Sequence, residues 1–141
     1  MPLEVHVVTP EREVWTGSAE MLVARGIEGE LGIMGGHEPM LVQLAIGPLR
    51  IHREGGELLA AVVDGGFLHV ATHEGVTRAD VLASQAVLAA EIDVEETRRV
   101  LAEHEADAAA LQGQGAEVEE AELEGLKREM EKAQARLKLV G

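Results

Sequence analysis

The stretch PMLVQLAIGPLRIHREGGELLAAVVDGGFLHVATHEGVTRADVL, residues 39–82, consists of short apolar segments separated by turn residues. The apolar segments read PMLVQL, LRIHR, LLAAVVD, GFLHVA and VTRADVL, and the breaks between them read IGP, REGGE, DGG and HEG. Glycine and proline are the strongest local signals for turns. Apolar runs of this length between such breaks predict β-strands rather than helices.

The same pattern continues toward the N-terminus. In LEVHVV, residues 3–8, three aliphatic side chains alternate with Glu4 and His6, which is the period of a half-buried strand. Further strands are predicted for EVW, residues 13–15, and EMLVA, residues 20–24. About eight short strands joined by glycine-rich turns are typical of a sandwich or barrel. Because Trp15 and Phe67 are the only aromatic residues, its core must be mainly aliphatic.

The composition changes near residue 85, where glycine disappears until Gly113 and Ala, Glu and Leu dominate. Asp93, followed three positions later by Glu96, predicts a helix N-cap with a capping box, and the helix is expected to run to about Gln112. The glycines at 113–115 end it, and a second helix is expected over 117–139. The sequence therefore predicts a β domain over residues 1–84 and an antiparallel two-helix hairpin over residues 85–141.

Each predicted helix carries one apolar stripe at spacings of three and four residues. The first stripe is Val94, Thr97, Leu101, His104, Ala108 and Leu111; the second is Leu123, Leu126, Met130, Ala133, Leu137 and Val140. Alanine makes up much of the first stripe, so the hairpin buries little by itself. We expect it to be marginally held and able to repack on another surface, although a permanent helical appendage fits the same pattern.

Charges are segregated along the second helix. Acidic residues lead it, and the bases follow as Lys127, Arg128, Lys132, Arg136 and Lys138. This order complements the helix dipole, which is one sufficient explanation for it. The alternative is that the basic end binds an acidic surface of a partner.

The overall charge limits the classes of partner. The chain has 12 basic and 26 acidic residues, a net charge of −14. Phosphate contacts need Lys and Arg, so nucleic acid and anionic membrane surfaces are disfavoured, and basic surfaces are the natural partners. Solubility alone would also account for an acidic surface. No segment reaches the roughly 18–20 apolar residues that span a bilayer.

Enzymatic chemistry is not indicated. The segment GELGIMGGHEP, residues 29–39, is predicted as a glycine-rich loop, but it lacks the lysine of a P-loop and the glycine spacing of a dinucleotide fingerprint. The chain has no cysteine, and its 6 histidines are too scattered to form a metal site. No set of nucleophile, base and oxyanion donors is evident. We therefore predict a non-enzymatic protein without a metal.

Read together, residues 29–51, GELGIMGGHEPMLVQLAIGPLRI, resemble the signature of the epsilon subunit of F-type ATP synthases, approximately G-E-L-G-I-x-P-G-H-x-P-L. The matching residues are Gly29, Glu30, Leu31, Gly32, Ile33, Gly36, His37 and Pro39. VDGGFLHV, residues 63–70, resembles the second signature of that family, and VTPEREVWTGSAE, residues 8–20, resembles its opening segment. Gly35 departs from the pattern, because the family usually has proline there.

The resemblance implies a sandwich of about ten strands followed by two helices. It implies a rotor subunit in the central stalk of a proton-translocating ATP synthase, which couples the gamma subunit to the c-ring and inhibits ATP hydrolysis through its helices. It places the protein peripherally on the cytoplasmic face of the cell membrane, held there only through the complex.

The resemblance also assigns surfaces. Glu28, Glu30, Leu31 and Gly32 would contact the c-ring, and His37, Pro39 and Met40 would contact gamma. The basic residues of the second helix, Lys127, Arg128, Lys132, Arg136 and Lys138, would meet an acidic segment of the alpha/beta catalytic head.

Two other functions fit the sequence. One is an ATP-sensing regulator that binds nucleotide through Ile92, Asp93, Arg98 and Arg99. Some members of the family bind ATP through I/L-D-x-x-R-A; here Ile92 and Asp93 match, but Glu96 and Thr97 occupy the Arg and Ala positions. We therefore expect no cofactor and weak or absent ATP binding. The other is an unrelated β-sandwich adaptor with a coiled-coil tail.

Overall fold

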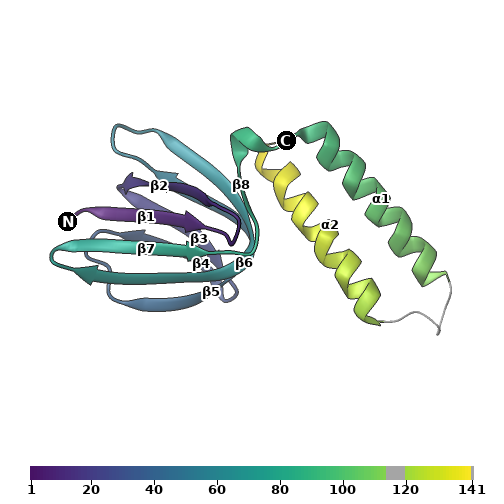
Figure 1. Ribbon diagram of the computed structural model, residues 1–141, viewed down its shortest axis with the longest axis horizontal. Helices are drawn as coiled ribbons and strands as arrows, with labels where there is room; N and C mark the ends of the chain where they lie inside the picture. The colour runs from purple at the N-terminus through teal and green to yellow at the C-terminus, as the bar shows by residue number, and fades with distance from the viewer. Residues whose placement is uncertain (114–119, 141) are drawn as a thin grey trace. The chain divides into compact units, whose positions relative to one another are not determined.

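A computed structural model describes residues 1–113 and 120–140 of the chain (Figure 1). The chain divides into two compact units, Met1–Glu91 and Ile92–Gly141. The sequence pattern placed the boundary after residue 84. The first unit extends to Glu91 because Ala86–Leu88 still pairs with the sheet.

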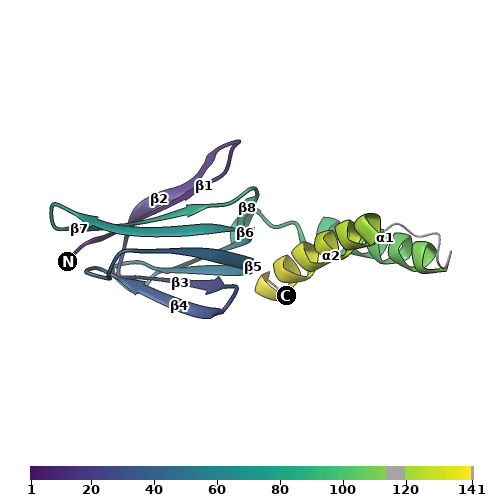
Figure 2. The same cartoon turned by 90° about the horizontal axis from the view of Figure 1, so that it is seen from below.

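The first unit is a β-sandwich, as the sequence predicts. Its strands are β1 Leu3–Val8, β2 Glu13–Ala19, β3 Met21–Gly26, β4 Gly29–Met34, β5 Met40–His52, β6 Leu58–His73, β7 Val76–Leu82 and β8 Ala86–Leu88. They form one 8-stranded hydrogen-bonded sheet in the order β2-β1-β7-β6-β5-β3-β4, with β8 beside β6. This sheet closes over itself, so that β1, β2 and β7 lie on one side and β3, β4 and β5 on the other (Figure 2).

Two predicted turns are wrong. The IGP and DGG segments lie inside continuous strands, β5 and β6, which pair with each other on both sides of these segments. The β5–β6 ladder is interrupted only at Ala45 and Gly65, and Gly65 and Gly66 both adopt positive φ. Glycine here bends a strand rather than ending it. Counting the two long strands as two each accounts for the expected number of about ten.

The first half of the glycine-rich segment is also a strand, β4, rather than a loop. It pairs antiparallel with β3 through a tight hairpin in which Gly26 is opposite Gly29, and its Ile33 is fully buried. Glycine weakens an isolated strand, but pairing with β3 and burial of Ile33 outweigh that cost.

The core between the two layers is aliphatic. Its fully buried large side chains include Leu3, Leu22, Ile33, Leu49, Ile51 and Leu68. Trp15 packs at the margin of this core, with the guanidinium of Arg53 lying 5.6 Å from its ring centroid. Phe67, by contrast, is exposed.

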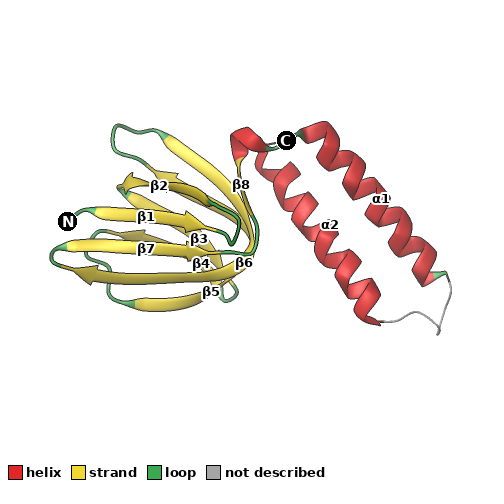
Figure 3. Cartoon of the chain, in the orientation of Figure 1, coloured by secondary structure: helices red, strands yellow, loops and turns green. Residues whose placement is uncertain are grey.

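The second unit contains two long helices, α1 Val94–Gln112 and α2 Glu120–Val140, which run antiparallel beside each other (Figure 3). A short 3-10 turn, η1 Ala89–Glu91, precedes them. The Asp93 N-cap is confirmed, since its carboxylate accepts the Glu96 N–H at 3.0 Å. The predicted start of the second helix, residues 117–119, lies outside the described residues.

The predicted apolar stripes face inward. Every stripe position is partly or fully buried, yet only Ala108 on α1 and Ala133 on α2 are fully buried within the described helices. The hairpin thus has little core of its own. No helix in the described part of the chain is both long and apolar enough to cross a lipid bilayer.

Candidate functional site

The residues expected to contact the c-ring lie on the β3–β4 hairpin. Glu28 is in its turn, and Glu30, Leu31 and Gly32 follow on β4, the last strand of the sheet order. Glu28, Glu30 and Gly32 are exposed, whereas Leu31 packs against the core. An edge strand presents unpaired backbone groups, so this hairpin offers both carboxylates and main chain to a neighbour.

Of the residues expected to contact gamma, His37 and Pro39 lie beyond the opposite end of β4, in the loop before β5, and Met40 is the first residue of β5. The His37 N–H donates to the Met34 carbonyl at 3.1 Å, and its Nδ1 lies 2.8 Å from the Glu38 carbonyl oxygen. A carbonyl only accepts, so Nδ1 carries the proton and the Nε2 of a neutral ring remains an acceptor. At about 3.3 Å per residue, the four steps from Glu30 to Met34 place the carboxylate-bearing residue of β4 about 13 Å from the start of this loop.

Gly35 is sterically required in this loop. A Cβ added at this position would lie 1.8 Å from the Met1 carbonyl oxygen and 2.7 Å from its carbon. The N-terminal residue therefore occupies the space that a side chain, including the family's proline, would need. The departure from the signature is explained by this contact.

An exposed apolar row crosses β5, β6 and β7, and sequence reasoning missed it. Leu41, Phe67 and Leu82 are 68%, 48% and 50% exposed. Phe67 is paired with both Gln43 and Leu82, and Leu41 lies two residues from Gln43, so all three apolar side chains share the outer face. Ile27, 60% exposed, adjoins them through its N–H bond to the Gln43 carbonyl. The alternation in GFLHVA, with Leu68 and Val70 inward, was the available signal.

Residues 84–91, which lead out of the sandwich, are held to it by an ion pair and hydrogen bonds. Both Glu91 carboxylate oxygens bind the Arg12 guanidinium, at 2.7 and 2.8 Å, and Oε1 also accepts the Leu88 N–H. The Arg12 guanidinium holds the pKa of the Glu91 carboxyl below its usual range. Further back, the buried Asp64 accepts the Ser84 hydroxyl at 2.7 Å and the Gln85 N–H at 2.8 Å. Only Ile92 then separates this anchor from the N-cap of α1.

Three of the four candidate nucleotide-binding residues already make hydrogen bonds or ion pairs within the first turns of α1. The Asp93 carboxylate caps α1, and Arg98 binds Glu95 at 3.2 Å. Arg99 binds both Glu96 and Glu103, and these carboxylates raise the pKa of its guanidinium. Ile92 precedes the cap and is half-buried. Both arginines are therefore already paired with carboxylates of the same helix.

The basic residues of α2 form two rows. At 3.6 residues per turn, Arg128, Lys132 and Arg136 follow one row, and Lys127 and Lys138 lie on another side. Lys132 pairs with Glu129 at 2.9 Å, and Lys127 lies 3.9 Å from Glu124. From Lys127 to Val140, five bases stand against two acids, a net charge of +3.

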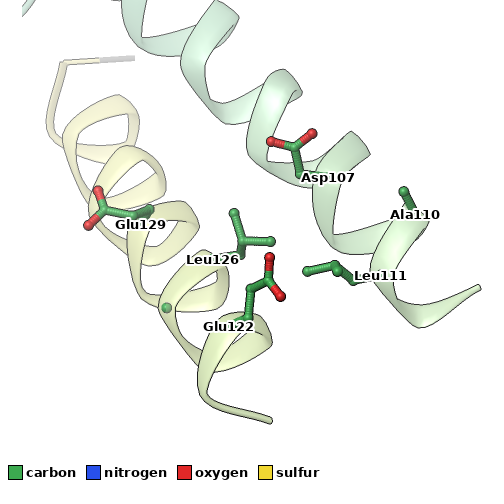
Figure 4. A pocket seen from close by; sticks show the side chains of 7 residues that line it. Asp107, Ala110, Leu111, Glu122, Leu126 and Glu129 are labelled. Atoms are coloured by element: carbon green, nitrogen blue, oxygen red, sulfur yellow. The ribbon is translucent and has the colours of Figure 1, made fainter. Parts of the chain in front are cut away.

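A groove of about 590 Å³ runs between the helices (Figure 4). It is lined by Asp107, Ala110, Leu111, Glu122, Gly125, Leu126 and Glu129. Its charged groups are all carboxylates, so it does not suit a nucleotide phosphate. Among the described residues, no group of three or more histidines and acids is placed to hold a metal ion.

The comparisons agree on one family. The family model for the ATP synthase delta/epsilon chain β-sandwich domain matches residues 2–89. The ATP synthase epsilon chain of Frankia casuarinae is 48% identical over 88 residues, covering 62% of this chain and 99% of the relative. That of Thermobifida fusca is 47% identical over 109 residues, covering 75% and 77%.

Solved structures extend the likeness to the helices. A chain of the Euglena gracilis mitochondrial ATP synthase, in its OSCP/F1/c-ring structure, is 27% identical with a TM-score of 0.78, covering 99% of this chain and 82% of that one. A chain from the central stalk and c-ring of the Tetrahymena thermophila enzyme, 19% identical with a TM-score of 0.55, shares the fold.

Proposed function

This chain belongs to the family of ATP synthase delta and epsilon chains, and we propose that it serves as the epsilon subunit that couples gamma to the c-ring in a proton-translocating F-type synthase. The observation that carries this proposal is the likeness of nearly the whole chain, sandwich and helices together, to a subunit of an F1/c-ring assembly. In this role the chain is non-catalytic, and it reaches the cytoplasmic face of the membrane through the complex.

The sandwich provides two docking surfaces for this role. The row of Leu41, Phe67 and Leu82 is continuous with the loop that holds His37 and Pro39, because that loop leads directly into Met40 and Leu41. Exposed apolar side chains gathered on one face are typical of a protein interface. Gamma would cover this face, and the carboxylates of the β3–β4 hairpin would meet the c-ring.

The helices provide the regulatory element. Their small shared core makes the α1–α2 contact easy to exchange for another, and the Arg12–Glu91 pair confines any movement to Ile92 and beyond. The basic rows of α2 would then bind acidic surface on the alpha/beta head. Exposed ion pairs contribute at most about 1 kcal/mol each, so several must act together and inhibition should weaken with salt.

We expect Glu30→Lys and His37→Ala to weaken assembly without unfolding the sandwich. Both side chains lie outside the core. Each belongs to one of the two proposed docking surfaces. For His37→Ala we expect the affinity for gamma to fall about tenfold, which corresponds to ~1.4 kcal/mol. Titration of the variant with gamma measures this loss. Loss of proton-driven synthesis in reconstituted vesicles would report on Glu30→Lys. Glu54→Lys, the same charge change in the exposed β5–β6 turn, is the matched control. Unchanged behaviour of both variants would remove these residues from the interfaces.

The ATP-sensing alternative is tested by calorimetry on the full-length chain. We expect no sub-millimolar ATP binding, because Arg98 and Arg99 are held by Glu95, Glu96 and Glu103. The variant Glu96→Arg with Thr97→Ala restores the I-D-x-x-R-A pattern and frees Arg99 from one partner, so it should bind ATP more tightly than the unmodified chain. Sub-millimolar affinity in the unmodified chain would favour the sensor instead.

A further inference from the structure

Thr77, the second residue of β7, is a polar side chain that the proposed function does not use. It is fully buried, with 0% of its surface exposed. Three groups surround its hydroxyl: the Gly36 N–H at 2.7 Å, the Thr72 hydroxyl at 2.9 Å and the Met1 sulfur at 3.4 Å.

This buried hydroxyl is satisfied by hydrogen bonds. A threonine hydroxyl donates once and accepts twice. The Gly36 N–H can only donate to it and the Met1 sulfur can only accept from it, while either threonine hydroxyl can be the donor in the bond between them. A buried polar group satisfied in this way holds its partners in fixed positions.

The partner that matters is Gly36. It has φ +88°, a conformation that glycine tolerates, and it immediately precedes His37, whose own N–H returns to the Met34 carbonyl. The Thr77 bond therefore fixes the backbone on one side of His37, and the Met34 bond fixes His37 itself. Removing the hydroxyl would leave the Gly36 N–H without its acceptor, a loss that the loop can relieve only by moving toward water.

We propose that Thr77 is a positioning residue: its buried hydroxyl holds the loop of residues 35–39 in the conformation that gamma recognises. This inference rests on the proposed function, because it assumes that the loop is part of the gamma interface. Thr77 itself touches no partner, since it is buried, and it acts through the Gly36 backbone.

The test uses three variants of the full-length chain. Thr77→Val keeps the branched shape and removes the hydroxyl. Thr77→Ser keeps the hydroxyl and removes the methyl group. Thr72→Val is the matched control, because it removes the neighbouring hydroxyl but leaves the acceptor of the Gly36 N–H in place. Should Thr77→Val not fold, Thr77→Ala removes the same hydroxyl with no added bulk.

Two quantities are measured for each variant: the hydrogen-exchange rate of the Gly36 amide by NMR, and the affinity for gamma. We expect Thr77→Val to speed exchange at Gly36 at least about tenfold and to weaken gamma binding by about tenfold, the effect of losing one hydrogen bond to a buried group. Thr77→Ser and Thr72→Val should stay close to the unmodified chain in both.

Three results would overturn the inference. Unchanged Gly36 exchange in Thr77→Val would show that the hydroxyl does not hold the loop. Faster exchange with unchanged gamma affinity would show that gamma does not read the loop conformation. Equal losses in Thr77→Ser and Thr77→Val would assign the effect to packing. Failure of the proposed function is distinct, because the unmodified chain would then not bind gamma at all.

Discussion

Truncation of the chain after Ile92 is expected to leave assembly of the ATP synthase intact and to raise its rate of ATP hydrolysis. The residues of the main core cluster all lie in the first unit, and the cut retains β8 and the Arg12–Glu91 pair. The docking surfaces should therefore be unaffected. If the hairpin acts as an inhibitor through a coupling free energy of 1–3 kcal/mol, hydrolysis should rise by about 5- to 150-fold.

The measurement compares ATP hydrolysis by purified complexes that contain the full or the truncated chain. A second truncation, after Gly113, keeps α1 and removes α2; it should release hydrolysis to the same extent if α2 is the inhibitory element. Changing Lys127, Arg128, Lys132 and Arg136 together to Ala should give part of the release. Arg98→Ala with Arg99→Ala, which removes bases from α1 instead, is the control. Unchanged hydrolysis in both truncated complexes would mean that the hairpin is not the inhibitor in this enzyme.

Gly66→Ala is expected to lower the free energy of unfolding by about 3–5 kcal/mol, at the high end for a single substitution. Gly66 has φ +107°, and a Cβ there would lie 2.1 Å from the Leu82 carbonyl oxygen and 2.9 Å from the Ala83 Cα. Both contacts are with backbone that is held by the pairing of Phe67 with Leu82, so the clash cannot be relieved by a side-chain rotation.

Gly56→Ala separates backbone strain from this clash. Gly56 also has positive φ, +87°, but nothing lies within 4 Å of its added Cβ. It should cost only the strain of the left-handed conformation, about 1–2 kcal/mol. Chemical denaturation of the full-length variants gives both values. Equal losses of stability in the two variants would show that the close approach of β6 to residues 82–83 contributes nothing.

Local patterns were sufficient for several elements. The strict alternation of LEVHVV and the VTRADVL segment predicted β1 and β7 with the bounds that the structure shows. The Asp93 cap and the last residue of α1, Gln112, were also predicted from neighbouring residues. Each of these signals depends on contacts between residues close in sequence, which is why the sequence reveals them. The family signatures of the sandwich are local patterns of the same kind.

The structure of glycine-rich segments is harder to predict from sequence, because the same residues can end a strand or bend it. The sequence predicts turns at IGP and DGG, yet β5 and β6 continue through them, because the two strands pair with each other on both sides of these segments. The sequence predicts a loop for GELGIM, yet this segment pairs with β3 as strand β4. The choice between turn and bend is made by the pairing strand, which lies elsewhere in the chain.

Sequence alone therefore determined the two-part organisation of this protein, its aliphatic sandwich, its helix caps and stripes, and the family whose signatures it carries. Only the tertiary structure decided which surfaces its functional residues share. Glu91 meets Arg12 across 79 positions of sequence, and Gly36 meets Thr77 across 41. Phe67 and Leu82 become one exposed row only when β6 pairs with β7. No local sequence pattern predicts these long-range contacts, because the register between distant strands depends on the simultaneous burial of all their inward faces.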